Sequence, residues 1–152
     1  MRKGFTILEL LVSMGVILLV SGGVVAAFNN FNESQRVRQA ALTLKGNVRY
    51  AQNKAVSGDK PTSGCVTLQG YTVSFTGTSY SIQALCDGGL VGDSTTTSLP
   101  AGVSFVVPIP AAFTFAVLTG RNASDRTLTV SGLNYSFSVQ VSAGGTVTTV
   151  GF

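Results

Sequence analysis

The sequence predicts an α+β protein in which a long N-terminal helix packs on an antiparallel β-sheet head domain. Three features of the 152-residue chain indicate this fold. An apolar run covers residues 5–28, and an amphipathic helical pattern continues from there to residue 58. After Pro61 the apolar residues alternate with a period of two, which is typical of strands.

The first element, residues 5–28, is apolar enough to cross a membrane. As a helix, about 24 residues extend about 36 Å, which covers a hydrocarbon layer of roughly 30 Å. The run is too long for the apolar region of a secretory signal, and no Ala-x-Ala-like site follows it. Arg2 and Lys3 precede the run, and short basic flanks stay cytoplasmic. The sequence therefore predicts a single-pass protein of the cytoplasmic (inner) membrane with its C-terminal head outside.

The second element, residues 29–58, repeats apolar residues at alternating steps of four and three, which predicts one buried face of a helix. These positions are Val37, Ala41, Leu44, Val48, Ala51 and Ala55. Because no proline interrupts them, both elements should form one helix of about 50 residues, with Gly58 at its C-terminal cap and Pro61 beyond. A basic stripe of Arg38, Lys45 and Arg49 falls on another side, either as a solvated face or as a contact to phosphate or acidic neighbours.

A β-hairpin is the clearest element of the head. The stretch "YTVSFTGTSYSIQALC" alternates on both sides of Gly77-Thr78, which suits a two-residue type II′ turn. One register turns all six large or apolar residues to the same side: Phe75 opposite Tyr80, Val73 opposite Ile82 and Tyr71 opposite Ala84. Further strands are predicted in "VSFVV", "FTFAVL", "RTLTV", "YSFSVQV" and "TVTTV". The stretch "CDGGLVGDSTTTSLPAG" lacks periodicity and is predicted to be a mobile surface loop.

Cys65 and Cys86 are the two cysteines of the chain. An even pair in an exported domain indicates a disulfide, and the alternative is two free buried thiols. Cys86 is expected at the end of the hairpin, and Cys65 is expected to begin the strand before it. A bridge would close a loop of about 20 residues and contribute roughly 3 kcal/mol.

The opening stretch "KGFTILELLV" resembles the processing and methylation site of type IV prepilins and of the pseudopilins of type II secretion. The resemblance implies that prepilin peptidase cleaves after Gly4 and that Phe5 becomes the N-methylated first residue. It implies a leader at residues 1–4, a membrane and filament-core helix at 5–28, an amphipathic stalk at 29–58 and a head at 59–152. Its partners would be prepilin peptidase, other pilin or pseudopilin subunits, the membrane and an assembly platform.

Glu9 stands inside the apolar run, where a lone carboxylate is costly. It lies about one helical turn from the new amine of Phe5. When subunits stack with an axial stagger, the amine of one chain can meet the carboxylate of a neighbour. A misregistered subunit would leave both charges unpaired in an apolar bundle at a cost of several kcal/mol. Glu9 is therefore predicted to direct assembly; the alternative is a side chain that reaches the lipid headgroups.

The order of a long helix, strands that include "FTFAVLTGRNASDRTLTV" and a final hairpin is similar to the GspH/FimT branch of pseudopilins and minor pilins. Some members of that branch bind DNA through arginines near the C-terminus. This chain has no arginine after Arg126. Arg121 and Arg126 flank a polar turn and could contact phosphate, or they could simply keep the turn soluble.

The composition does not favour an enzyme or a cofactor. The chain has no histidine, so histidine-based triads and His-ligated zinc sites are excluded. The head acids Asp59, Asp87, Asp93 and Asp125 do not form a catalytic carboxylate pair, and calcium at Asp87 or Asp93 would have few ligands. A net charge of +4 does not by itself indicate nucleic-acid binding. The sequence predicts a pilin or minor pilin, with two alternatives: a GspH-type pseudopilin, or a DNA-binding minor pilin of natural transformation.

Overall fold

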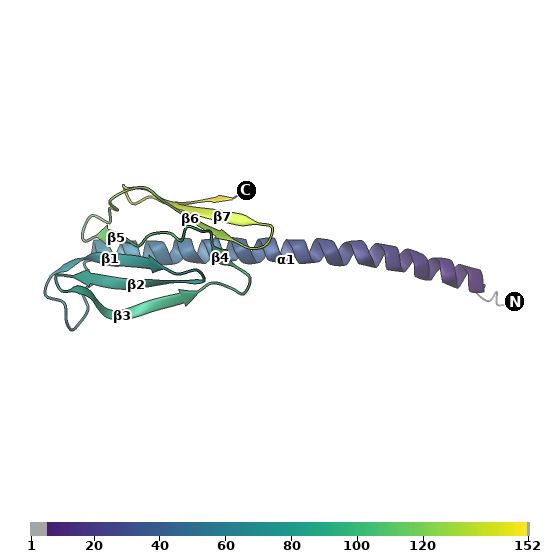
Figure 1. Cartoon of the computed structure of the whole chain (residues 1–152), viewed down its shortest axis with the longest axis horizontal. Helices are drawn as coiled ribbons and strands as arrows, with labels where there is room; N and C mark the ends of the chain where they lie inside the picture. Colours follow the sequence, from purple (N-terminus) through teal and green to yellow (C-terminus); the bar gives the residue numbers. More distant parts are fainter. Residues whose placement is uncertain (1–5, 152) are drawn as a thin grey trace.

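A long helix with two β-sheets wrapped around its second half forms the molecule (Figure 1). The computed structural model describes the backbone of residues 6–151 and the side chains of residues 6–21 and 28–150. Within this part there is one helix, α1 (Ile7–Ser57), followed by strands β1 (Leu68–Phe75), β2 (Ser79–Cys86), β3 (Gly89–Ser98), β4 (Ser104–Phe105), β5 (Phe113–Ala116), β6 (Arg126–Ser131), β7 (Ser136–Val141) and β8 (Val147–Gly151). The predicted α+β class is confirmed.

The helix is continuous over 51 residues, as the absence of proline predicts. Gly58 ends it in the left-handed conformation, with φ 64°, and the N–H of Asp59 donates to the carbonyl of Lys54 at 3.1 Å. This is the predicted glycine cap, which needs a residue without a Cβ. The N-terminal part of α1 projects away from the head as a bare rod (Figure 1).

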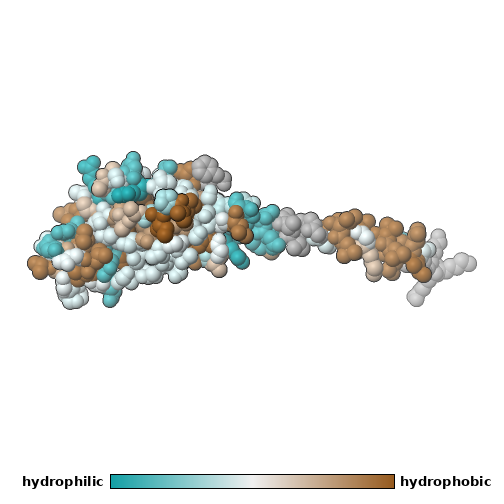
Figure 2. All heavy atoms as spheres, in the orientation of Figure 1, coloured by the Kyte–Doolittle hydropathy of each residue, from teal (hydrophilic) through white to brown (hydrophobic). Residues whose placement is uncertain are grey.

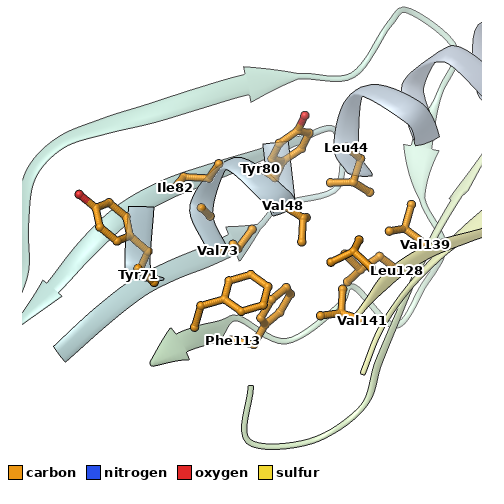
Figure 3. Packing of buried hydrophobic residues seen from close by; sticks show 14 of the residues in the cluster. Leu44, Val48, Tyr71, Val73, Tyr80, Ile82, Phe113, Leu128, Val139 and Val141 are labelled. Atoms are coloured by element: carbon orange, nitrogen blue, oxygen red, sulfur yellow. The ribbon is translucent and has the colours of Figure 1, made fainter. Parts of the chain in front are cut away.

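The strands form two four-stranded antiparallel sheets, one on each side of the buried face of α1. Sheet A has the order β3-β2-β1-β5, and sheet B has the order β4-β6-β7-β8. All six residues of the predicted helical stripe are fully or almost fully buried between them. Figure 3 shows how the helix joins the sheets: Val48 lies between Val73 of β1 and Leu128 of β6.

Aromatic rings close the core where the two sheets meet. The ring of Phe105, on β4, packs edge-on against that of Phe75, on β1, with centroids 5.2 Å apart. Phe75 also stacks on Phe113 of β5 at 5.9 Å. These contacts join sheet B to sheet A without passing through the helix, so the two sheets and α1 share one hydrophobic core.

The hairpin has the predicted register: Phe75 pairs with Tyr80, Val73 with Ile82 and Tyr71 with Ala84. The predicted type II′ turn is wrong. Such a turn needs a positive φ at its first central residue, and Gly77 does not adopt one. Instead, the hydroxyl of Thr76 accepts the N–H of Ser79 at 3.1 Å and shares a further hydrogen bond with its hydroxyl. The backbone N–H of Thr76 also donates to the carbonyl of Ser79 at 2.8 Å, so backbone and side chain of Thr76 together close this turn.

The predicted mobile loop after Cys86 is also wrong, because residues 89–98 form β3. This strand lies at the edge of sheet A and pairs only with β2. Most of its side chains are exposed, so its sequence does not need to alternate apolar and polar residues and lacks the pattern that predicts a strand. Its run of threonines still favours an extended backbone.

Two predicted strands are shorter than their sequence patterns. Strand β4 ends at Phe105, and β5 ends at Ala116. Pro108 and Pro110 follow β4, and proline has no N–H to give to a sheet. After β5, Leu118 has a positive φ of 64° and donates its N–H to the carbonyl of Ala55, on the helix. The chain therefore leaves sheet A at Leu118, whose backbone N–H bonds to the helix.

Cys65 and Cys86 form a disulfide with their Cα atoms 5.5 Å apart. Both cysteines are buried. Cys86 ends β2 as predicted, but Cys65 does not begin a strand, because β1 starts at Leu68. The bridge thus fastens the segment between α1 and β1 to the far end of the hairpin.

Reduction of this disulfide should lower the stability of the head by roughly 3 kcal/mol, because the cross-link restricts the unfolded chain over about 20 residues. The measurement is thermal unfolding of the full chain in detergent micelles with and without reductant. In the control, a Cys65→Ser, Cys86→Ser double variant, reductant should have no effect on the melting temperature. An equal melting temperature for oxidised and reduced wild-type protein would contradict the prediction.

Candidate assembly site

The helix begins with a capped first turn that contains Glu9. Thr6 is the N-cap residue, and its hydroxyl accepts the backbone N–H of Glu9 at 3.3 Å. Threonine is favoured at this position because its oxygen satisfies one of the free N–H groups at a helix start. The side chain of Glu9 is exposed. Gly4 and Phe5, and with them the predicted leader at residues 1–4, lie outside the residues that the structure describes.

Exposed apolar side chains cover the described first part of α1. The exposed fraction is 82% for Ile7 and 81% for Leu19, and the whole set is Ile7, Leu8, Leu10, Leu11, Val12, Met14, Val16, Ile17, Leu18, Leu19 and Val20. Figure 2 shows them as a brown segment at the end of the rod. A contiguous apolar surface of this size indicates contact with lipid or with other protein chains.

Among the residues described, the structure contains no helical stretch with both the length and the apolar character needed to cross a membrane.

The predicted span, residues 5–28, includes Phe5 and the side chains of residues 22–27, which lie outside the described part.

Glu33 fixes the point at which the helix enters the head. Its carboxylate accepts the backbone N–H of Asn134 at 2.8 Å and the side-chain amide of the same residue at 3.0 Å. These hydrogen bonds favour the charged form and lower the pKa of Glu33. Asn134 lies in the turn between β6 and β7, so this contact holds the tip of sheet B against α1.

Two further helical side chains bind the carbonyls of distant loops. The amide of Gln52 donates to Gly120 at 3.0 Å and to Gly145 at 2.8 Å. The guanidinium of Arg49 donates to the carbonyl of Val147, at the start of β8, at 3.0 Å. The sequence identifies Arg49 only as one residue of a basic stripe and gives no signal for Gln52. Both lie beside the buried stripe, where a long polar side chain can reach over the core to the loops.

Replacing Gln52 with alanine should destabilise the head by about 1–3 kcal/mol, because the carbonyls of Gly120 and Gly145 lose their donor. The measurement is urea unfolding of the full chain in detergent micelles. Gln39→Ala is the matched control, since Gln39 is exposed on the same helix. Equal stability losses in the two variants would show that the carbonyl contacts of Gln52 do not stabilise the head.

The rest of the basic stripe stays at the surface. Arg38 is exposed and Lys45 is half-buried. Arg38 lines a shallow groove beside sheet B together with Leu42 and Phe137. The stripe thus combines one residue that binds the head, Arg49, with two that leave their charges near solvent.

Arg121 and Arg126 line different hollows in the described part of the head. Arg121 is exposed beside Gln69 and Asn122, whereas Arg126 is half-buried on β6 and lines a hollow with Gln140. A shared phosphate contact would require the two guanidinium groups to face one space. The structure does not bring the two residues together in that way.

Three acids of the head have different hydrogen-bond partners, whereas Asp59 and Asp93 line one hollow. Asp59 pairs with Lys54 at 2.6 Å, and this hydrogen bond raises the pKa of Lys54. Asp87 accepts a hydrogen bond from Gln69 at 3.2 Å, and Asp125 accepts one from the backbone N–H of Ala143 at 2.7 Å. Among the described residues, no three carboxylate or thiol side chains lie close enough to hold a metal ion.

Residues 1–25 match the family model of the prokaryotic N-terminal methylation motif. Neither the curated proteins nor the solved structures that were compared with the chain gave a match. The family match shows that the chain carries a type IV prepilin-like signal. This signal supports a type IV pilin-like or pseudopilin protein that prepilin peptidase processes. It also implies anchoring in a membrane and assembly with other pilin subunits into a surface or periplasmic filament.

Proposed function

We propose that the chain is a structural subunit, a pilin or minor pilin, of a type IV pilus-like filament. The observation that carries this proposal is the prepilin-like signal at residues 1–25, which overlaps the start of α1. The described first part of this helix carries many exposed apolar side chains. Among the described side chains of that helix, the buried apolar ones begin at Val37, so the head packs on its second part. Such a division suits a subunit that inserts one end in an apolar bundle and displays the other.

In this proposal prepilin peptidase cleaves after Gly4 and Phe5 receives the N-methyl group. Residues 5–28 hold the precursor in the cytoplasmic (inner) membrane as a single span, with the head outside. An assembly platform then moves the processed chain into the filament. The exposed apolar side chains pass from lipid to the surfaces of neighbouring helices, so their surroundings stay apolar throughout.

Glu9 would set the register of each new subunit. Its carboxylate is exposed on the first turn of α1, where another chain can reach it. Pairing with the amine of Phe5 on a neighbour would neutralise both charges within the bundle, whereas a shifted subunit would leave each of them buried alone. The carboxylate therefore acts by selecting one axial position, and no catalytic step is assigned to the chain.

The test is the N-terminus of assembled protein. Filaments sheared from cells should contain this chain, and mass spectrometry of the released protein should find methylated Phe5 as its first residue. Assembled protein that begins at Met1 or Arg2 would contradict the processing step. Absence of the chain from every sheared fraction would contradict the filament role.

The GspH-type pseudopilin of a secretion system is the second candidate, because the prepilin-like signal supports it equally. Deletion of the gene separates the two roles: loss of protein secretion with surface fibres unchanged would favour the pseudopilin. A DNA-binding minor pilin would rest on Arg121 and Arg126, and their separate hollows lend it no support. A gel-shift experiment with the full chain in detergent tests that role directly.

A further inference from the structure

A hollow lies at the base of the head, where α1 leaves the two sheets. Its volume is about 320 Å³, within the range of roughly 300–1,000 Å³ that is usual for small-molecule sites. The turn between β6 and β7 and the segment between β3 and β4 line it, and Figure 1 shows both at the end of the head nearest to the rod. One face of the helix supplies its polar side chains, Asn29, Asn32, Glu33 and Arg36. Leu133, in the turn between β6 and β7, supplies part of its apolar lining.

Arg36 gives the hollow a positive group that is available to a ligand. Its side chain is exposed, and among the described residues it takes part in no ion pair. The carboxylate of Glu33 is engaged elsewhere, because its two oxygens accept the backbone and side-chain N–H groups of Asn134. The amides of Asn29 and Asn32 are further possible donors on the same face. These groups suit an anion with several oxygens, and a guanidinium binds a phosphate especially well.

Exposed apolar side chains lie next to these polar groups. Leu133 is 92% exposed, and on α1 Phe28 and Phe31 are 61% and 60% exposed. The hydrogen bonds between Glu33 and Asn134 hold the turn against the helix, so Leu133 is presented at a fixed place. The base of the head therefore offers phosphate-binding and apolar groups side by side. A phospholipid has the same two kinds of group next to each other.

The position of the hollow along α1 agrees with such a partner. In the proposed function, on which this inference rests, residues 5–28 span the hydrocarbon layer, so Phe28 lies at its edge. At 1.5 Å per residue, Glu33 lies about 7 Å and Arg36 about 12 Å further along the axis. The headgroup layer extends about 5–8 Å beyond the hydrocarbon. Because helical side chains lean toward the N-terminus and arginine is long, the guanidinium of Arg36 can reach this layer.

We propose that the base of the head binds a phospholipid of the outer leaflet, with the lipid phosphate in the hollow at Arg36 and with Leu133 in the headgroup layer. Charge favours an anionic lipid, since a basic side chain near the surface is attracted to it. The contact area is small, but the membrane span keeps the base next to the lipid, and this high local concentration sustains a weak contact. The head of a subunit that waits for assembly is thereby held at one orientation to the bilayer.

The experiment uses a single introduced tryptophan as a reporter, because the chain contains none. The full chain with Leu133→Trp is reconstituted in vesicles of phosphatidylglycerol or phosphatidylcholine that are brominated near the headgroup end of the acyl chains. We expect the bromine to quench the emission, and to do so more strongly in phosphatidylglycerol. Val66→Trp is the matched control, since Val66 is 84% exposed and lies beyond the C-terminal end of α1, next to Cys65. Its emission should not be quenched.

The phosphate contact is tested by adding Arg36→Gln to Leu133→Trp. We expect the additional quenching in phosphatidylglycerol to be lost. Arg38→Gln is the control, because Arg38 is exposed on the same helix but does not line this hollow, and the preference for phosphatidylglycerol should remain. High salt should reduce the preference in Leu133→Trp protein, since it screens exposed charges.

The span is measured separately, by washing the vesicles at alkaline pH, and the fold of each variant by its disulfide and the protease resistance of its head. Absence of quenching in Leu133→Trp protein that resists the wash would overturn the base contact and leave the proposed function standing. A preference for phosphatidylglycerol that survives Arg36→Gln would overturn the phosphate site. Equal quenching of Val66→Trp would show that the head lies on the bilayer by another face, and it would also overturn the contact. A chain that the wash removes has no span, which would overturn both the proposed function and the base contact.

Discussion

We expect Glu9→Leu protein to accumulate in the membrane fraction and to be almost absent from sheared filaments. Leucine removes the cost of a carboxylate in an apolar layer and, with it, the attraction to the amine of Phe5 on a neighbouring subunit. Each 1.4 kcal/mol of lost attraction is about a factor of ten in the assembly equilibrium, so a loss of several kcal/mol takes filament yield below detection.

The structure makes Glu9→Leu a clean test. The N-cap bond runs from the backbone N–H of Glu9 to Thr6, and leucine keeps that N–H. Losing an acidic residue from the first turn weakens the helix start by only about 0.3–1 kcal/mol. Cleavage after Gly4 and the fold of the head should therefore stay normal, and N-methylation is measured separately by mass spectrometry.

The control is Glu9→Asp, which keeps the charge on a shorter side chain and should retain part of the filament yield. Immunoblots of membrane and sheared fractions give the distribution for each variant. A normal yield from Glu9→Leu would show that the carboxylate does not direct assembly, and the register role would have to be abandoned.

We expect Gly4→Val to leave an uncut precursor in the membrane and no processed chain. The peptidase must bring its catalytic groups close to the backbone at the bond after Gly4, and a branched side chain on that residue blocks the approach. Because cleavage creates the amine of Phe5, the variant also lacks the positive partner that Glu9 is proposed to meet.

Intact mass measurement of the membrane-bound protein tests this variant, and Lys3→Ala serves as the control for a change beside the site that leaves the glycine in place. Efficient cleavage of Gly4→Val would contradict the assignment of the bond. Normal filament yield from an uncut Gly4→Val chain would contradict the link between processing and assembly.

Local periodicity explains which parts of the fold were predictable. The helical stripe from Val37 to Ala55 and the hairpin register of Phe75 with Tyr80 follow from spacing alone, since each pattern buries one face. Strand β3 buries almost no face and has a paired strand on one side only, so its sequence carries no such pattern. The type II′ turn predicted at Gly77 is wrong, because the hydroxyl of Thr76 helps to close the turn and Gly77 has no positive φ.

The contacts that fix the head on the helix were beyond prediction from sequence. Glu33 and Asn134 are 101 residues apart, and Gln52 and Gly145 are 93 apart. No spacing in the sequence predicts either contact, because both depend on how the two sheets wrap around α1. The role assigned to Glu9 rests on the motif that its neighbours in the sequence form, and it stays a prediction. The length of β4 was hard to predict for a different reason: "VSFVV" has the composition of a longer strand, although the strand ends at Phe105 and prolines follow it.

The long-range contacts of α1 have a consequence for the order in which the chain can fold. Synthesis delivers the helix first and strands β7 and β8 last, yet these strands cover one flank of the buried helical stripe. Sheet A is complete once β5 has emerged, whereas sheet B is complete only when β8 has emerged. Until then Leu44 and Val48 are open to water on one side. The contacts of β7 and β8 with the helix join residues far apart in the sequence, and such contacts form slowly. In a nascent chain, one flank of the helical stripe therefore stays uncovered until β7 and β8 have been synthesised.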